Sequence, residues 1–134
     1  FGMPGIPCLY YGSEWGEKAD KKQGDPALRP SFEAPEWNQL TDLLQAMVKA
    51  HRESDALCYG DFQYLVLTNK QTIFQRRTDR ERVLVAVNAD SQPYTAHFNA
   101  NCGQAVDLIT GALHDFGGGS ELPPYSVAFW KCER

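Results

Sequence analysis

The sequence has 134 residues and a formal net charge of -4 at pH 7. That length holds one ordinary domain, or a small domain plus part of another, and it is too short for a complete eight-stranded α/β barrel of roughly 250 residues. A hydrophobic share of 43% and an aromatic share of 12% exclude a disordered chain and predict a buried core.

The basic residues are scattered rather than gathered into a stripe, which argues against nucleic acid as a partner. The densest basic cluster lies at residues 76–82, where Asp79 and Glu81 interrupt four arginines. This mixture of charges predicts a solvated hairpin tip.

Cofactor, metal and membrane signals are weak in this sequence. Its four cysteines, at positions 8, 58, 102 and 132, form no CxxC pair, and its three histidines lack ligand spacing. We therefore expect buried free thiols, no metal and no cofactor. No apolar run reaches membrane length, and the sparse cysteines favour a cytoplasmic location.

The first part of the chain reads as one βα unit. Residues 6–11 form a short apolar run without alternation, which predicts a strand covered on both faces. A polar loop follows over about residues 13–34, long enough to suggest function or mobility. Pro35 suits a first helical position, and apolar residues at helical spacing predict a helix over about residues 35–54.

From residue 59 onward the period changes to that of short strands. Turn-forming residues separate the runs, with no helical pattern between them, and this spacing predicts an antiparallel β-sandwich. The expected strands lie at residues 62–67, 72–76, 83–88, 94–98, 105–109 and 127–130.

One dense motif points to a family. The stretch GIPCLYYGSEWG at residues 5–16 resembles the segment on the last barrel strand of α-amylase-superfamily glycosidases. Residues 43–57 look like the final barrel helix, and segments beginning at 59, 83 and 122 are similar to strands of the family's C-terminal domain. The resemblance implies a mainly β fold: an antiparallel β-sandwich at 58–134, preceded at 1–57 by the last strand, loop and helix of a (β/α) barrel.

The long loop carries the candidate substrate-binding residues. Asp25-Pro26-Ala27-Leu28-Arg29 is similar to the Asp-Pro-x-x-Arg motif of the neopullulanase, cyclomaltodextrinase and oligoglucosidase branches. The resemblance implies that Asp25 and Arg29 help to hold a sugar of an α-glucan or maltooligosaccharide. A carboxylate accepts from sugar hydroxyls and a guanidinium donates to them. The alternative is a surface ion pair that only pins the loop.

We assign no catalytic residue to this chain. Retaining glycosidases need two carboxyl groups about 5 to 5.5 Å apart, and in the resembled family both precede the motif at residues 5–16. The chain alone is therefore expected not to hydrolyse glucan, whereas the parent enzyme would be an α-amylase-type glycosidase.

The sequence also allows two other interpretations of the sandwich. The sandwich could be a stand-alone carbohydrate-binding module that uses Tyr94, Tyr125 or Trp130, or it could be purely structural. For Trp15, Trp37 and Trp130, packing is favoured over sugar stacking. Without neighbouring barrel elements, the apolar surface of residues 6–11 and of the helix would be uncovered. We therefore expect self-association, with disorder of residues 1–34 or packing of the helix onto the sandwich as the alternatives.

Overall fold

The computed structural model describes residues 1–132, which divide into two compact units. One unit combines Phe1–Ile6 with the chain from Ala46 onward, and the other is Pro7–Gln45. The first unit contains all the strands, and the second contains only short helical turns and the beginning of a longer helix.

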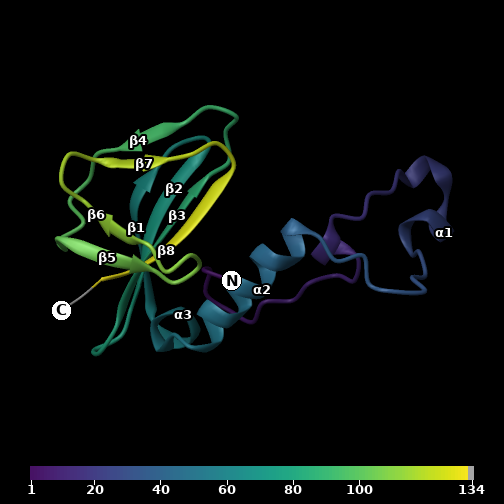
Figure 1. Ribbon diagram of the computed structural model, residues 1–134, viewed down its shortest axis with the longest axis horizontal. Helices are drawn as coiled ribbons and strands as arrows, with labels where there is room; N and C mark the ends of the chain where they lie inside the picture. The colour runs from purple at the N-terminus through teal and green to yellow at the C-terminus, as the bar shows by residue number, and fades with distance from the viewer. Residues whose placement is uncertain (133–134) are drawn as a thin grey trace. The chain divides into compact units, whose positions relative to one another are not determined.

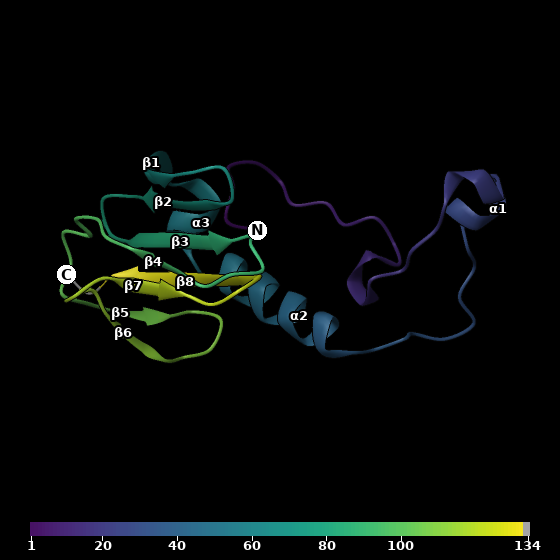
Figure 2. The ribbon, with the colours of Figure 1, turned by 90° about the horizontal axis from the view of Figure 1, so that it is seen from above.

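The first unit is built on a six-stranded antiparallel sheet. Its strands follow in the order β1-β2-β3-β8-β5-β6 (Figure 2). Strands β4 and β7 pair separately as a second, two-stranded sheet. The bounds are β1 Asp61–Leu67, β2 Gln71–Arg77, β3 Arg82–Asn88, β4 Tyr94–Ala96, β5 Gln104–Asp107, β6 Leu113–Asp115, β7 Ser120–Leu122 and β8 Ser126–Cys132.

The large sheet has a core on each face. On one face, Leu84 and Trp130 pack with Ala96 of β4 and Leu122 of β7. On the other face, side chains of alternate residues on the same strands pack against helical residues, and this cluster consists of Ala50, Ala56, Leu57, Phe74, Val83, Val85 and Phe129. Figure 1 shows β4 and β7 on one side of the large sheet and α3 on the other. The predicted antiparallel sandwich is confirmed.

Six strands lie where the sequence predicts them, and two were missed. β6 and β7 have three residues each and flank the turn-forming run Gly117-Gly118-Gly119, so this part of the sequence reads as a connection.

The helices are α1 Asp25–Leu28, α2 Gln39–Arg52 and α3 Asp55–Tyr59, with 3-10 turns η1 Ser13–Trp15 and η2 Lys21–Gln23. The predicted helix over residues 35–54 is too long at both ends. It starts at Gln39 because the Asn38 side chain accepts hydrogen bonds from the N–H groups of Leu40 and Thr41 at 2.9 and 3.2 Å. At the other end, Ser54 begins a new helix by accepting from the Leu57 N–H at 3.1 Å.

The prediction of a strand at residues 6–11 is wrong for this chain. These residues form no strand, and Ile6 is 96% exposed. A strand needs a hydrogen-bonded neighbour, and no described segment pairs with this run.

The basic cluster at residues 76–82 does form a hairpin connection, because the Thr78 N–H bonds to the Glu81 carbonyl at 2.8 Å. The prediction that this cluster is solvated is only partly correct. Arg76 is 1% exposed and donates to the carbonyls of Gly2 and Gly60 at 3.0 and 2.9 Å. The Glu81 carboxylate accepts from Ser54 Oγ at 2.9 Å and from the Ala56 N–H at 2.8 Å, which anchors the start of α3.

Candidate functional site

The candidate sugar-binding residues lie on α1 within the second unit. Gly24 precedes the helix with φ of 87°, a conformation that suits glycine, and Pro26 follows in the first turn. Asp25 begins α1 and Arg29 caps its end, so the two residues are four apart along one helical turn. Both are exposed.

No ion pair joins Asp25 to Arg29, because the ion pairs among residues 1–132 are Lys70–Asp90 and Lys131–Glu81. The alternative in which an ion pair of these two residues only pins the loop therefore lacks its ion pair in this structure. Both residues are exposed, one at each end of the short helix α1.

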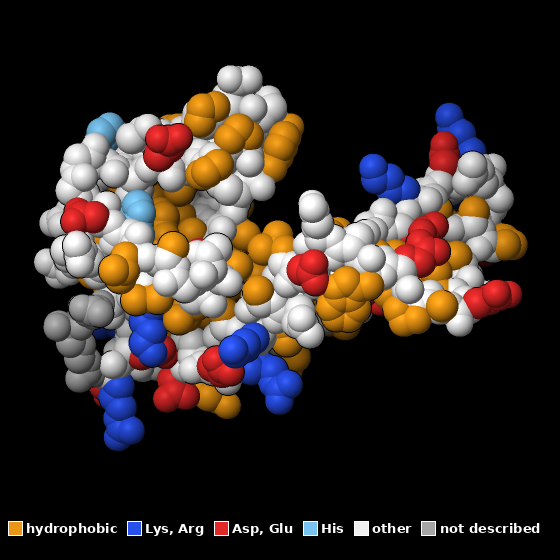
Figure 3. Space-filling model, viewed as in Figure 1, with side chains coloured by type: hydrophobic (Ala, Val, Ile, Leu, Met, Phe, Trp, Pro, Cys, Tyr) orange, Lys and Arg blue, Asp and Glu red, His pale blue; other side chains and the backbone are white. Residues whose placement is uncertain are grey.

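An aromatic cluster lies in the same unit. The rings of Tyr11 and Trp15 pack edge-on against the ring of Phe32, with centroid distances of 6.0 and 5.0 Å. The centroids of the Tyr10 and Tyr11 rings are 4.8 Å apart. Gly12 permits this packing, since a Cβ there would lie 3.2 Å from the Phe32 ring and its φ is 88°. Figure 3 shows hydrophobic side chains at the surface of this segment.

Arg29 is electrostatically linked to this cluster. Burial and a hydrogen bond with Tyr10 raise the pKa of the Tyr11 hydroxyl, whereas the Arg29 cation lowers it. The guanidinium therefore lies close enough to the phenol to influence it. Exposed aromatic rings together with a nearby cation offer the two kinds of contact that a sugar ring uses.

The beginning of α2 holds the loop in place. Asn38 Nδ2 donates to the Trp15 carbonyl at 2.9 Å, and Thr41 Oγ1 donates to the Glu14 carbonyl at 2.8 Å. Glu14 thus contributes its backbone oxygen to holding the loop. Trp37 is 57% exposed and bonds to the Asp42 carboxylate through its indole nitrogen at 2.6 Å.

The aromatic residues of the sandwich differ in their availability to a ligand. Trp130 is 4% exposed and stacks on His114 at 4.1 Å, so its expected packing role is confirmed. Tyr94 is half-buried against the core between the two sheets. Tyr125 is 74% exposed, which leaves it as the accessible member of the three suggested sugar platforms.

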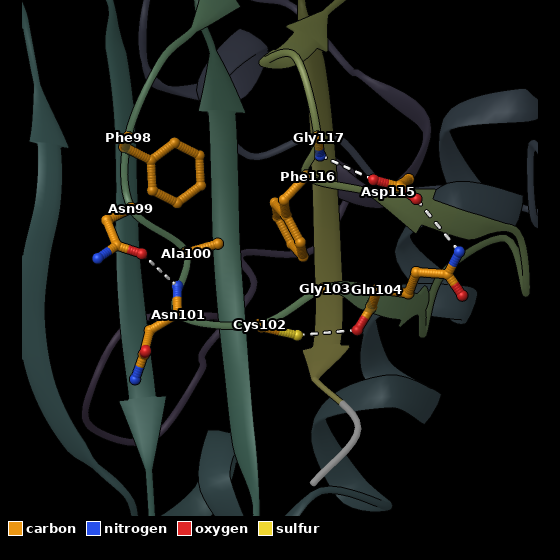
Figure 4. A pocket seen from close by; sticks show the side chains of 10 residues that line it. All are labelled: Phe98, Asn99, Ala100, Asn101, Cys102, Gly103, Gln104, Asp115, Phe116 and Gly117. Carbon is orange, nitrogen blue, oxygen red and sulfur yellow. Dashed lines mark hydrogen bonds between the residues drawn. The ribbon is translucent and has the colours of Figure 1, made fainter.

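A concavity of about 380 Å³ on the sandwich had no signal in the sequence (Figure 4). Its polar groups largely bond to one another: Asp115 accepts from the Gly117 N–H at 2.7 Å and from Gln104 Nε2 at 3.2 Å. Its lining residues are Phe98, Asn99, Ala100, Asn101, Cys102, Gly103, Gln104, Asp115, Phe116 and Gly117.

The described residues contain no group of three or more His, Cys, Asp or Glu side chains that could hold a metal ion. Within residues 1–132, no helix is long and apolar enough to cross a membrane.

No family model matches the sequence. The chain is 30% identical over 96 residues to a cyclomaltodextrinase of a Bacillus species, a match that covers 68% of this chain and 17% of the relative. It is 26% identical over 134 residues to a cyclomaltodextrinase of Thermoanaerobacter pseudethanolicus, with coverage of 98% and 23%.

The chain also superposes on solved structures. A cyclomaltodextrin glucanotransferase with a three-domain ABC distribution superposes with a TM-score of 0.80 at 25% identity, covering 99% of this chain and 30% of that one. An α-amylase of Geobacillus thermoleovorans in complex with acarbose gives a TM-score of 0.82 at 22% identity, with coverage of 99% and 31%.

The fold is that of the C-terminal β-sandwich domain of α-amylase-family structures. In sequence as well, the chain matches a C-terminal region of an α-amylase-family enzyme, and its relatives are cyclomaltodextrinases and cyclomaltodextrin glucanotransferases. It spans about a sixth of the length of the curated relatives, at 17% and 16% of the first two.

Proposed function

We propose that this chain is the non-catalytic C-terminal region of an α-glucan-acting glycoside hydrolase. In this proposal, residues 1–57 complete the catalytic barrel and residues 58–134 form a sandwich that stabilises it. The loop that carries α1 contributes Asp25 and Arg29 to a sugar subsite. The observation that carries the proposal is the pair of exposed, oppositely charged side chains on α1, in a chain whose relatives act on cyclomaltodextrins by name.

The chemistry of the loop favours binding over bond cleavage. Glu14, Glu17, Asp20 and Asp25 lie on or beside one solvent-facing loop. Catalytic carboxyl groups need a fixed separation and a rigid support. Arg29, by contrast, needs only to donate to hydroxyl groups from a place beside aromatic rings.

Two measurements test this proposal. The purified chain should release no reducing sugar from maltooligosaccharides or cyclodextrins. In an enzyme that unites this chain with the catalytic carboxylates, Arg29→Ala should raise KM about 10-fold or more with kcat little changed, because a charged hydrogen bond contributes about 1.5–3 kcal/mol.

Lys22→Ala is the matched control, because it removes one positive charge from the same exposed loop. If Arg29→Ala and Lys22→Ala alter KM equally, or if Arg29→Ala lowers only the melting temperature, Arg29 has no role in a subsite.

A second candidate function is carbohydrate binding by the sandwich itself, which the 74% exposure of Tyr125 favours. Titration of the chain with maltotriose, whose complex with AmyP is among the similar structures, should then show binding that Tyr125→Ala removes. Binding that Tyr125→Ala leaves intact would contradict this second function.

We also propose that the isolated chain self-associates. Its exposed apolar side chains include Ile6 at 96%, Tyr10 at 58% and Leu43 at 38%, and such surface is costly to leave in water. Sedimentation at micromolar concentration should detect a dimer. A strictly monomeric species would contradict this proposal.

A further inference from the structure

Cys102 and Cys132 are brought together by the fold, although they are distant in sequence. Cys132 ends β8 and pairs with Ala105 of β5. Cys102 lies in the turn just before β5, and its thiol donates to the Gln104 carbonyl at 2.8 Å, as Figure 4 shows. Both cysteines pack against the same core cluster between the two sheets.

The two thiols also influence each other directly. Burial, together with the neighbouring Cys102 side chain, raises the pKa of the Cys132 thiol to about 12. This influence agrees with their shared place beside the core cluster between the two sheets. Neither cysteine takes part in a disulfide.

Both thiols are within reach of small reagents, because each is only half-buried. Cys102 lines the concavity of about 380 Å³. Cys132 lines a neighbouring groove of about 590 Å³, which shares Asn99 and Asn101 with that concavity. A small molecule can therefore approach the pair from two sides.

We propose that Cys102 and Cys132 form a redox-modification site that closes to an intramolecular disulfide when a low-molecular-weight disulfide, such as oxidised glutathione, supplies the oxidising equivalents. The site is independent of the proposed sugar-binding loop, which lies in the other unit of the chain.

The exchange proceeds in two balanced steps. Cys102 loses its proton, and its thiolate attacks one sulfur of the oxidant, so that the oxidant's S–S bond breaks and one small thiol leaves. Cys132 then loses its proton and attacks the Cys102 sulfur of this mixed disulfide, which releases the second small thiol. The protein loses two protons and two electrons, and the oxidant gains both. Cys102 reacts first, because burial disfavours the Cys132 thiolate.

The disulfide would tie the turn before β5 to the end of β8. Cys102 lies three residues before Ala105, the residue that pairs with Cys132. A disulfide between the two cysteines needs their Cα atoms to be about 4.4–6.8 Å apart. A cross-link between these elements restricts the unfolded chain and so stabilises the sandwich. It would also fix the turn that lines the concavity in Figure 4.

Tryptic mapping tests the proposal directly on the full chain. Residues 83–130 contain no Lys or Arg, so cleavage after Arg82 and Lys131 places the two cysteines in peptides 83–131 and 132–134. After treatment with oxidised glutathione, we expect these two peptides to be joined and then separated by dithiothreitol. The melting temperature of the oxidised chain should exceed that of the reduced chain by about 5–15 °C.

The Cys8→Ser, Cys58→Ser double variant keeps the pair and should behave like the wild type. Adding Cys102→Ser to this variant should abolish both the joined peptide and the shift in melting temperature. The proposal is overturned if both thiols stay free, if each carries glutathione without a link, or if the link forms between two chains. Because oxidised and reduced forms of one folded protein are compared, the result does not depend on how a variant folds.

Discussion

The carboxylate of Glu81 connects the sandwich to α3, and substitution of this residue tests how much the connection contributes to stability. It accepts hydrogen bonds from Ser54 Oγ at 2.9 Å and from the Ala56 N–H at 2.8 Å, and it pairs with Lys131 Nζ at 2.7 Å. The Glu81 side chain is only 9% exposed, whereas Lys131 is 47% exposed. One carboxylate thus joins the start of α3, the β2–β3 hairpin and β8.

We expect Glu81→Gln to lower the free energy of unfolding by about 2–3 kcal/mol. Each charged hydrogen bond contributes about 1.5–3 kcal/mol and a neutral one about 1 kcal/mol, so two bonds weaken while the shape is kept. Lys131 adds little, since its exposed ammonium is rehydrated. Urea unfolding followed by circular dichroism would measure the loss, with a melting temperature lower by about 5–12 °C.

The pH dependence provides an independent check of the same group. Burial raises the pKa of Glu81, but hydrogen bonds from Ala56 and Lys131 outweigh it, so the pKa lies below its usual 4.5. A lowered carboxyl pKa contributes stability above pH 4.5 that is lost as pH falls through the folded-state pKa. The difference between wild type and Glu81→Gln should therefore shrink below pH 4.5.

Asp90→Asn is the control, because it alters the exposed Lys70–Asp90 pair at 3.1 Å and should leave stability within experimental error. Equal effects of the two substitutions, or a Glu81→Gln difference that does not change with pH, would refute this account of α3 anchoring.

Two further predictions concern packing and titration in the sandwich. Gly60→Ala should destabilise the chain by about 1–3 kcal/mol in urea unfolding, because a Cβ there would overlap the Ala56 carbonyl oxygen. Gly103→Ala, where a Cβ would meet no atom within 4 Å, should be neutral. Equal stabilities of the two variants would contradict the close approach at Gly60. Burial lowers the pKa of His114 below 6.5, so stability should fall as pH drops from 6.5 towards the folded-state pKa of this residue, and His114→Gln should remove that part of the pH profile in thermal melts.

Local patterns in the sequence determined much of this protein. The alternating runs from residue 62 onward predicted six of the strands, because a half-buried strand requires side chains to alternate between two faces. The motif at residues 5–16 indicated the family, which the relatives and the fold confirm. Asp25 and Arg29 were found from the same resemblance, and their role in sugar binding stays a prediction.

Only the tertiary structure decided the features that depend on distant neighbours. Residues 6–11 have the composition of a buried strand, yet they form none, because a strand is completed by a partner that the run cannot specify. Arg76 reads as a surface charge, but backbone carbonyls at Gly2 and Gly60 satisfy it in the interior. Cys102 and Cys132 come to the same part of the sandwich because β5 pairs with β8, which joins segments that the sequence separates.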